Sequence, residues 1–406
     1  MPKGNLVVRH HWLTSSIAAP KPVDSRSPHG QILVIVAVGL VAMIAMVGIV
    51  IDGGNAWGEQ RQTQNGADAM ANAGATVIAQ HIKGATKTSG DVGCAVEAAA
   101  TLNGVTTPTA VYTDVGGVVI TPEVQVAACG AGGSIPSTAQ GVKAHGERTF
   151  DTYLAQVVGV DQMTASAEAT AVAGLLTSTC IASSGCGLLP VTFPLTLTAC
   201  DGTNQQVQIG SSEYPIVDPT TADATNEVIV PICSAGPGAV GWLDFGCGNT
   251  QNTISNPCDV SFPLPTWMHT EPGNTNSLDT TINSMFAGPV VGVADDSLVT
   301  IPINDNTCNT DPGPNQPDCP GGNGSGNGNN FYYHVPKVAS FMLDQAYTSG
   351  SNSPECNAAP GQPFIGGNGA TGCFKGWFIQ YSDQGPVGAG ATGPNDPGVI
   401  GIQLIR

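Results

Sequence analysis

The hydrophobic pattern of the chain is dominated by one stretch near the N-terminus, residues 32–51, which contains no charged side chain. At a rise of about 1.5 Å per residue, a helix of this length crosses a hydrocarbon layer roughly 30 Å thick. A segment in lipid must satisfy its own backbone amides, so it has to be helical. A buried helix of a soluble protein is the alternative, but such helices rarely lack a polar face over so many residues. The pattern therefore predicts a transmembrane helix at 32–51.

Small residues recur at helical spacing after this stretch and predict a stalk helix over residues 52–85. Alanine and glycine on one helix face let another backbone approach closely. The neighbour is either a partner protein or the chain's own following domain. Gly66 and Gly74 each cost about 1 kcal/mol relative to alanine in a helix, so the stalk needs that neighbour. The expected partner face consists of Ala67, Met70, Ala71, Gly74, Ala75, Ile78 and Ile82.

Residues 86–177 alternate between helical and strand-like patterns and predict a small α+β unit. A loop is expected at 86–90, followed by an alanine-rich helix over Cys94–Asn103 that stops at Gly104. A second helix is expected at Phe150–Val158. The β-branched runs predict strands at Ala110–Thr113, Val118–Ala127, Val142–Glu147 and Met163–Ala173.

From residue 178 to residue 406, apolar runs alternate with Gly, Pro and Asn clusters, which is typical of a β-rich domain with long loops. One helix is expected at Asn276–Phe286, and the low-complexity stretch 311–330 is expected to be a flexible surface loop. The expected strands are Leu188–Thr198, Gln205–Ile209, Glu227–Ile232, Val240–Phe245, Val290–Val293, Leu298–Ile303, Phe331–Val335, Phe374–Tyr381 and Val399–Ile405. The predicted fold is a single N-terminal transmembrane helix continuing into a stalk helix, then a small α+β unit and a β-rich, disulfide-bonded C-terminal domain.

Composition supports this architecture. Charged residues make up 10% of the chain, and 53 Gly and 30 Pro exclude a long-helix bundle. The formal net charge of −18 argues against nucleic acid as a partner, because phosphates would be repelled.

The distribution of charge predicts the orientation of the helix. Residues 1–31 form a short basic tail with four Lys and Arg against one Asp, whereas residues 52–406 hold eight basic and 29 acidic residues. The positive-inside rule then places the tail in the cytosol and the C-terminal region in the periplasm or outside the cell, as in a single-pass cytoplasmic (inner) membrane protein. A cleaved signal peptide is the alternative, but the apolar run is longer than a signal peptide needs and no Ala-x-Ala site follows Ile51. An uncleaved signal anchor is therefore favoured.

All twelve cysteines follow the apolar stretch, which fits disulfides in an oxidising compartment. Zinc is disfavoured because no Cys-x-x-Cys occurs and no histidine clusters with the thiols. The small α+β unit contains only two cysteines, and short separations suggest pairs in the C-terminal domain. The candidate pairs are Cys94–Cys129, Cys180–Cys186, Cys200–Cys233, Cys247–Cys258, Cys308–Cys319 and Cys356–Cys373.

Catalytic signatures are sparse, and no catalytic residue, cofactor or metal site is expected. The sequence contains no Gly-x-Ser-x-Gly, His-Glu-x-x-His or P-loop. The pairs His145/Glu147 and His269/Glu271 share a strand face at i, i+2 spacing and are interpreted as solvated ion pairs rather than general bases. Calcium is a weak alternative, since carboxylate and amide oxygens gather in loops. Its candidate ligands are Asp295, Asp296, Asp305, Asn306, Asp311 and Asp318.

One set of motifs resembles a known family. The motifs are Gly30-Gln31 opening the apolar span, Asp52-Gly53-Gly54 closing it, and the small-residue run Gln64–Ala75. Together they are similar to the N-terminal region of TadG-like proteins of the Tad (tight adherence, Flp pilus) assembly system of bacteria. A weaker resemblance extends through Thr149–Gly174, so the likeness covers about residues 28–175.

The chain has Gly66, Met70 and Asn72 where the TadG-like family usually has alanine or leucine, and it lacks two patterns of related proteins. Flp-type and pseudopilin precursors have a Glu five residues after the cleavage-site glycine, whereas Ile35 follows Gly30 at that distance, so processing by a prepilin peptidase is not expected. The Asp-x-Ser-x-Ser pentad of a von Willebrand A-type domain is also missing.

The resemblance implies a membrane-anchored, non-enzymatic component of Tad/Flp pilus assembly or anchoring at the cell envelope, with pilus or pilus-assembly proteins as partners. A surface adhesin that binds a glycan or matrix ligand is the first alternative. An exported hydrolase is the second. Aromatic residues that could serve a glycan site, although most are expected in cores, are Trp242, Trp267, Phe331, Tyr332, Tyr333 and Trp377.

Overall fold

The fold is described from a computed structural model that covers residues 29–179, 187–200, 205–233, 240–256, 259–271, 278–286, 298–313, 316, 318–320, 332–348, 356, 370–380, 382–384, 386–388 and 395–405. The chain divides into two compact units. The first contains the helix up to Asn55 together with Thr152–Asp161, and the second contains Ala56–Asp151 and Gln162–Arg406.

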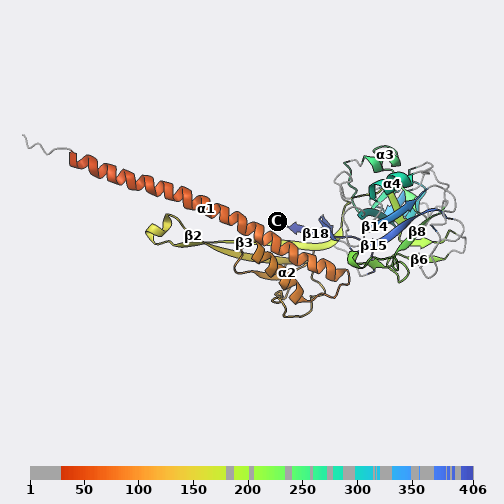
Figure 1. The fold of residues 1–406 in the computed structure, drawn as a ribbon, viewed down its shortest axis with the longest axis horizontal. Coiled ribbons are helices and arrows are strands. Elements are labelled where there is room, and N and C mark those ends of the chain that lie inside the picture. The colour runs from red at the N-terminus through yellow and green to blue at the C-terminus, as the bar shows by residue number, and fades with distance from the viewer. Residues whose placement is uncertain are drawn as a thin grey trace, which may run out of the picture. The chain divides into compact units, whose positions relative to one another are not determined.

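Helix α1 runs without interruption over His29–Ile82 (Figure 1). The predicted transmembrane and stalk segments are thus one element, which ends three residues before the expected boundary. Within the described residues, α1 is the one helix that is long and apolar enough to cross a membrane. The first unit also contains the 3-10 helix η1, Ala155–Val158. The helix expected at Phe150–Val158 is therefore wrong in its first part, because Phe150 and Asp151 extend a strand.

The second unit contains a sheet built on strands β1 (Thr109–Thr113), β2 (Gly141–Asp151) and β3 (Gln162–Leu176). Strands β16 (Ser382–Gln384) and β18 (Ile400–Ile405) continue it in the order β1-β2-β3-β18-β16, and β17 (Val387–Gly388) also pairs with β3. Residues 399–405 were expected to belong to the C-terminal domain, whereas β18 pairs antiparallel with β3 from Ile400–Leu175 to Ile405–Thr170. A local pattern identifies a strand but not its partner.

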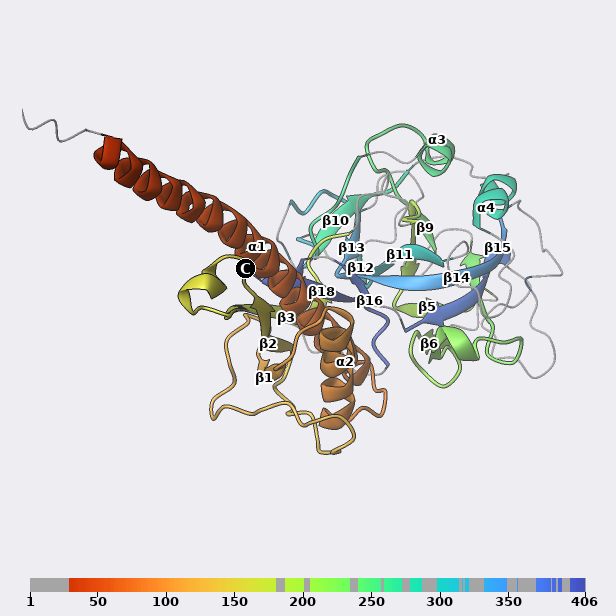
Figure 2. The ribbon, with the colours of Figure 1, turned by 60° about the vertical axis from the view of Figure 1, so that its left-hand side comes forward.

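Helix α2, Ser89–Leu102, packs on this sheet together with α1 (Figure 2). Its N-terminus is fixed by a capping box, in which Thr88 accepts a hydrogen bond from the Asp91 backbone and Asp91 accepts one from the Thr88 backbone. The helix therefore begins within the segment that was expected to be a loop. Val118–Ala127, expected as a strand, contacts β1 through the isolated bridges Thr113–Val119 and Val111–Gln125.

The rest of the second unit contains a sheet in the order β7-β15-β14-β11-β4-β9, with β8 also paired to β15. Aromatic side chains fill its core, and the ring centroids of Phe193 and Phe341 lie 5.6 Å apart. Strand β14 was not predicted from the sequence, although it lies at the centre of this sheet. The strands are β4 (Val191–Pro194), β7 (Ile216–Val217), β8 (Val228–Cys233), β9 (Gly241–Trp242), β11 (Leu298–Asn304), β14 (Lys337–Tyr347) and β15 (Ala370–Ile379).

Two smaller sheets and three short helices complete the described part. Strands β10 (Thr266–His269), β13 (Tyr332–Val335) and β12 (Asn306–Cys308) form one sheet, and β5 (Thr196–Thr198) pairs with β6 (Gln206–Gln208). The helices are η3 (Pro219–Thr221), α3 (Thr250–Ser255) and α4 (Leu278–Phe286). The expected strand 290–293 and most of the expected loop 311–330 lie outside the described residues.

Candidate functional site: the apolar helix segment and its flanking contacts

The apolar segment of α1 presents its side chains outward along its whole length. Leu33 is 72% exposed and Ile49 is 74% exposed, which no core helix of a soluble protein would tolerate. The remaining large apolar residues that are exposed in this segment are Ile32, Val34, Ile35, Val36, Val38, Leu40, Val41, Met43, Ile44, Met46, Val47, Val50 and Ile51. A continuous surface of this kind matches a lipid environment.

Asp52, the first charged residue after the segment, holds the N-terminus of η1. Its Oδ1 accepts a hydrogen bond from the backbone nitrogen of Tyr153 at 2.7 Å, and its Oδ2 accepts from those of Leu154 at 3.1 Å and Ala155 at 2.6 Å. These three donors are free because the first N–H groups of a helix have no partner within it. Asp52 thereby joins the end of the apolar segment to Thr152–Asp161. The sequence identified Asp52 as part of a motif but did not identify this contact.

Leu154 makes a second contact inside the same unit. A Cβ placed on Gly48 would lie 3.2 Å from Leu154 Cβ, so Leu154 packs directly over the bare backbone of the helix at that point. Gly48 belongs to the segment 32–51 and is buried. The loop Thr152–Asp161 is therefore fixed against the last turn of the apolar segment.

The expected partner face of α1 is buried against the chain's own sheet. A Cβ on Gly74 would lie 2.9 Å from Val142 Cγ2 and 3.2 Å from Val96 Cγ2, so only glycine admits this close approach. Of the face, Ala67, Met70, Ala71, Gly74, Ala75 and Ile78 are buried, whereas Ile82 is half-buried and packs against the same core. In the structure the neighbour of this face is the chain's own sheet, which is one of the two possibilities that the sequence leaves open.

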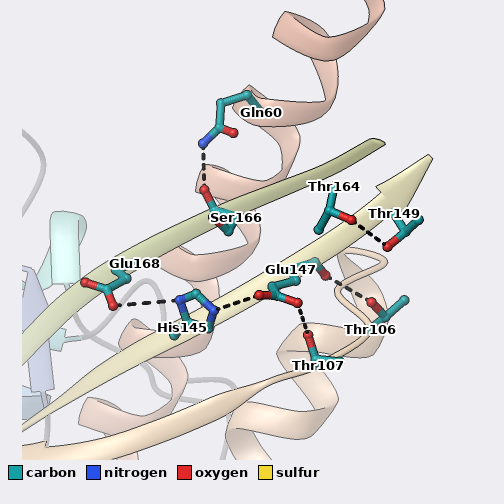
Figure 3. A network of polar contacts seen from close by, with 9 residues as sticks. All are labelled: Gln60, Thr106, Thr107, His145, Glu147, Thr149, Thr164, Ser166 and Glu168. Atoms are coloured by element: carbon teal, nitrogen blue, oxygen red, sulfur yellow. Dashed lines mark hydrogen bonds and ion pairs between the residues drawn. The ribbon is translucent and has the colours of Figure 1, made fainter. Parts of the chain in front are cut away.

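A polar network crosses the exposed side of the sheet, where His145 lies between two carboxylates (Figure 3). His145 Nε2 lies 3.5 Å from Glu147 Oε1, and His145 Nδ1 lies 3.7 Å from Glu168 Oε1. Glu168 is directly opposite His145 in the β2–β3 register. The hydrogen bond from Lys143, at 2.7 Å, lowers the pKa of Glu168 below its ordinary value. His145 thus faces Glu168 on the neighbouring strand as well as Glu147 on its own strand. Sequence spacing could not reveal the contact with Glu168.

The same network ties the hairpin β2–β3 to its neighbours. Thr107 Oγ1 donates to Glu147 Oε2 at 3.3 Å, and Gln60 Nε2 on α1 donates to the backbone oxygen of Ser166 at 2.8 Å (Figure 3). Both hydrogen bonds are exposed, and each joins the chain's own sheet to another part of the chain. The arrangement strengthens the packing of α1 on β3.

Lys83, which belongs to no sequence motif, lies just after α1 and is buried among residues of the C-terminal segment. Its ammonium group donates to the backbone oxygen of Asp396 at 2.6 Å and to that of Gly398. Burial lowers the pKa of Lys83 from 10.5 to about 8, although the Asp396 carboxylate acts in the opposite direction. Lys337 binds that carboxylate at 2.9 Å. Lys83 therefore links the end of α1 to the segment that leads into β18.

Three of the expected disulfides are present: Cys94–Cys129, Cys308–Cys319 and Cys356–Cys373. Cys200 and Cys247 are also disulfide-bonded. The other expected partners, Cys180, Cys186 and Cys258, lie outside the described residues, and the side chain of Cys233 is not described.

The remaining candidate residues are scattered. His334 Nδ1 lies 2.6 Å from Asp305 Oδ1, and His269 faces Asp244 at 4.0 Å. Burial raises the pKa of Glu271, the residue that spacing had paired with His269. Across the described ranges, no group of three or more His, Cys, Asp or Glu side chains is placed to hold a metal ion. Of the calcium candidates, Asp295 and Asp296 lie outside those ranges.

The aromatic candidates for glycan binding are mostly part of cores. Tyr333 and Trp377 are buried. Trp242 is half-buried, and its ring centroid lies 6.2 Å from that of Phe374. The Trp267 and His334 rings are tilted against each other with centroids 5.0 Å apart, and the centroids of the His269 and Tyr332 rings lie 4.9 Å apart. Phe331 lies outside the described residues.

Comparison with known proteins identifies the N-terminal region. Residues 30–77 match the family model described as putative Flp pilus-assembly TadE/G-like. The match covers the apolar segment, Asp52 and most of the buried small-residue face, and it confirms the resemblance found in the motifs of this region. The weaker resemblance at Thr149–Gly174 lies beyond it. No curated protein and no solved structure matches the chain.

Proposed function

We propose that this chain, whose residues 30–77 match the TadE/G-like Flp pilus-assembly family, is a membrane-anchored, non-enzymatic component of Tad/Flp pilus assembly or anchoring at the bacterial cell envelope. The family match is the observation that carries the proposal. The domains are a cytosolic basic tail at 1–31, a transmembrane helix at 32–51, a stalk to residue 85, an α+β unit at 86–177 and an exported β-rich domain from 178, whose last strands return to the α+β sheet.

Anchoring in the cytoplasmic membrane is supported by the exposed apolar surface of α1. A soluble environment would leave the fifteen large apolar side chains of residues 32–51 in water, each costing roughly 1.5–3 kcal/mol relative to burial. A bilayer removes this cost. The basic tail and the disulfides support the orientation with the N-terminus in the cytosol.

The small-residue face is occupied by the chain's own sheet, so exposed side chains elsewhere make the contact with pilus or assembly subunits. Trp57 on α1 is 62% exposed, and the Arg61 guanidinium lies 4.2 Å from its ring centroid. Tryptophan and arginine are the residues that most often anchor protein interfaces. We assign the partner contact to this Trp57–Arg61 pair.

The experiment that tests the proposal is deletion of the gene in its host, followed by counting of surface pili. The wild-type chain restores pili, whereas a chain in which residues 32–51 are replaced by a cleavable signal peptide does not. Trp57→Ala lowers pilus number while the protein remains in the membrane. Leu102→Ala is the matched control, since Leu102 is 87% exposed on a different helix. Unchanged pili after deletion, with loss of surface adhesion alone, would contradict the assembly role and favour the adhesin.

A further inference from the structure

The loop that joins β2 to β3 exposes apolar side chains next to the end of the apolar helix segment. Within Thr152–Asp161, Tyr153 is 61% exposed, Val157 is 80% exposed and Val160 is 45% exposed. Isolated exposed apolar residues are common on protein surfaces, but three in a ten-residue loop form a cluster. Nothing in the polar network of Figure 3 uses them.

The position of this cluster is fixed by contacts within the same unit. Asp52 binds the backbone nitrogens of Tyr153, Leu154 and Ala155, and Leu154 packs on Gly48. Gly48 is three residues inside the predicted transmembrane segment. The loop is thus held at the depth where that segment ends.

The shape of the loop keeps the apolar residues together. Gly159 ends η1 with φ +89°, a conformation that favours glycine, and its N–H bonds to the Gln156 oxygen at 3.0 Å. Thr152 N–H bonds to the Asp161 oxygen at 3.0 Å and closes the base of the loop. The tip is a short, closed turn whose backbone hydrogen bonds are largely internal, which suits partial insertion into lipid.

We propose that the loop Thr152–Asp161 inserts Tyr153, Val157 and Val160 into the interfacial region of the leaflet at the Asp52 end of the helix. The proposal rests on the proposed transmembrane placement of 32–51. The loop meets the boundary between lipid headgroups and acyl chains, because Leu154 packs on Gly48, which lies within that segment. Tyrosine is typical of this boundary, where its ring and its hydroxyl meet different environments.

The contact is apolar rather than electrostatic. Residues 149–162 contain no Lys or Arg, whereas Asp151 precedes the loop and Asp161 is its last residue. Attraction to anionic headgroups requires basic side chains. The loop therefore does not depend on anionic lipid.

The test uses the full chain in phosphatidylcholine vesicles that carry a radiolabelled acyl chain. A photoreactive benzoylphenylalanine replaces Val157, and in separate proteins Val41 or Leu102. Val41 lies in the apolar segment and reports the transmembrane placement, whereas Leu102 is an exposed apolar residue on α2. Lipid adduct is expected at positions 41 and 157, with about tenfold more at 157 than at 102.

The outcomes separate this inference from the proposed function. Adduct at 41 without adduct at 157, or adduct between 157 and another protein, overturns the lipid contact and leaves the membrane anchor intact. Loss of adduct at 41 overturns the anchor and the inference together. Equal adduct at 157 with and without added phosphatidylglycerol supports an apolar contact, and a several-fold increase with phosphatidylglycerol overturns it.

Discussion

The carboxylate of Asp52 accepts a hydrogen bond from the backbone nitrogen of Ala155 at 2.6 Å, across 103 positions of the sequence. One side chain thereby connects the end of the apolar helix segment to a loop between two strands. Hydrogen bonds to a charged group are stronger than neutral ones, so this contact fixes the loop more firmly than a single backbone bond would.

Asp52→Ala is expected to release the loop Thr152–Asp161. The amide protons of Tyr153, Leu154 and Ala155 lose their acceptor, and their hydrogen-exchange protection falls about tenfold. Asp52→Asn keeps one acceptor oxygen and gives an intermediate loss. Asp68→Ala removes a carboxylate from the same helix and leaves these amides unchanged. Full protection in Asp52→Ala would contradict the role of this carboxylate.

Gly74→Leu is expected to lower the free energy of unfolding by about 1–3 kcal/mol, because its side chain must displace Val142 and Val96. Gly58→Ala is the control. A Cβ on Gly58 meets nothing within 4 Å, so the alanine should raise helix stability by about 1 kcal/mol. Chemical denaturation of the full chain in detergent measures both. Equal stability of Gly74→Leu and wild type would show that the face is not packed.

Lys83 predicts a rise in stability with pH. Its pKa is about 8 in the folded chain against an ordinary value of 10.5, so the unfolded chain binds more protons between these values. The free energy of unfolding therefore increases by about 2 kcal/mol between pH 8 and pH 10. Burial raises the pKa of Tyr333 to about 12. This shift lowers the free energy of unfolding as the pH rises, but only above pH ~10, where the unfolded tyrosine loses its proton.

Denaturation at pH 8, 9 and 10 measures this dependence. Lys83→Met should flatten it, whereas Lys87→Met should preserve it. A slope that is identical in Lys83→Met and wild type would assign the effect to other groups.

The Cys94–Cys129 disulfide closes a separation of 35 residues, and Cys308–Cys319 closes one of 11. The chain-entropy relation assigns about 4 kcal/mol to the longer loop and about 3 kcal/mol to the shorter one. Replacement of each pair by alanine, followed by thermal denaturation, should therefore lower the melting temperature more for Cys94/Cys129. The reverse order would show that native packing outweighs loop entropy.

The sequence predicted the elements that depend on local pattern. The apolar segment, the small-residue face and several strands follow from spacing that repeats over neighbouring residues. The family resemblance came from motifs in the same region, Gly30-Gln31 and Asp52-Gly53-Gly54.

Contacts between distant segments could not be predicted. Nothing near Asp52 indicates that its partners are residues 153–155, and nothing near Ile400 indicates pairing with β3. Strand β14 was missed because its apolar run is buried on both faces and does not alternate. The small-residue face was identified, but spacing could not decide between its two possible neighbours.

The pairing of β18 with β3 has a consequence for biogenesis. A chain that emerges N-terminus first displays β3 long before Ile405 exists to pair with Thr170. During that interval the unpaired edge of β3 can join a strand from another molecule. Until the last strand arrives, this edge of β3 is therefore the part of the sheet that is open to pairing with another molecule.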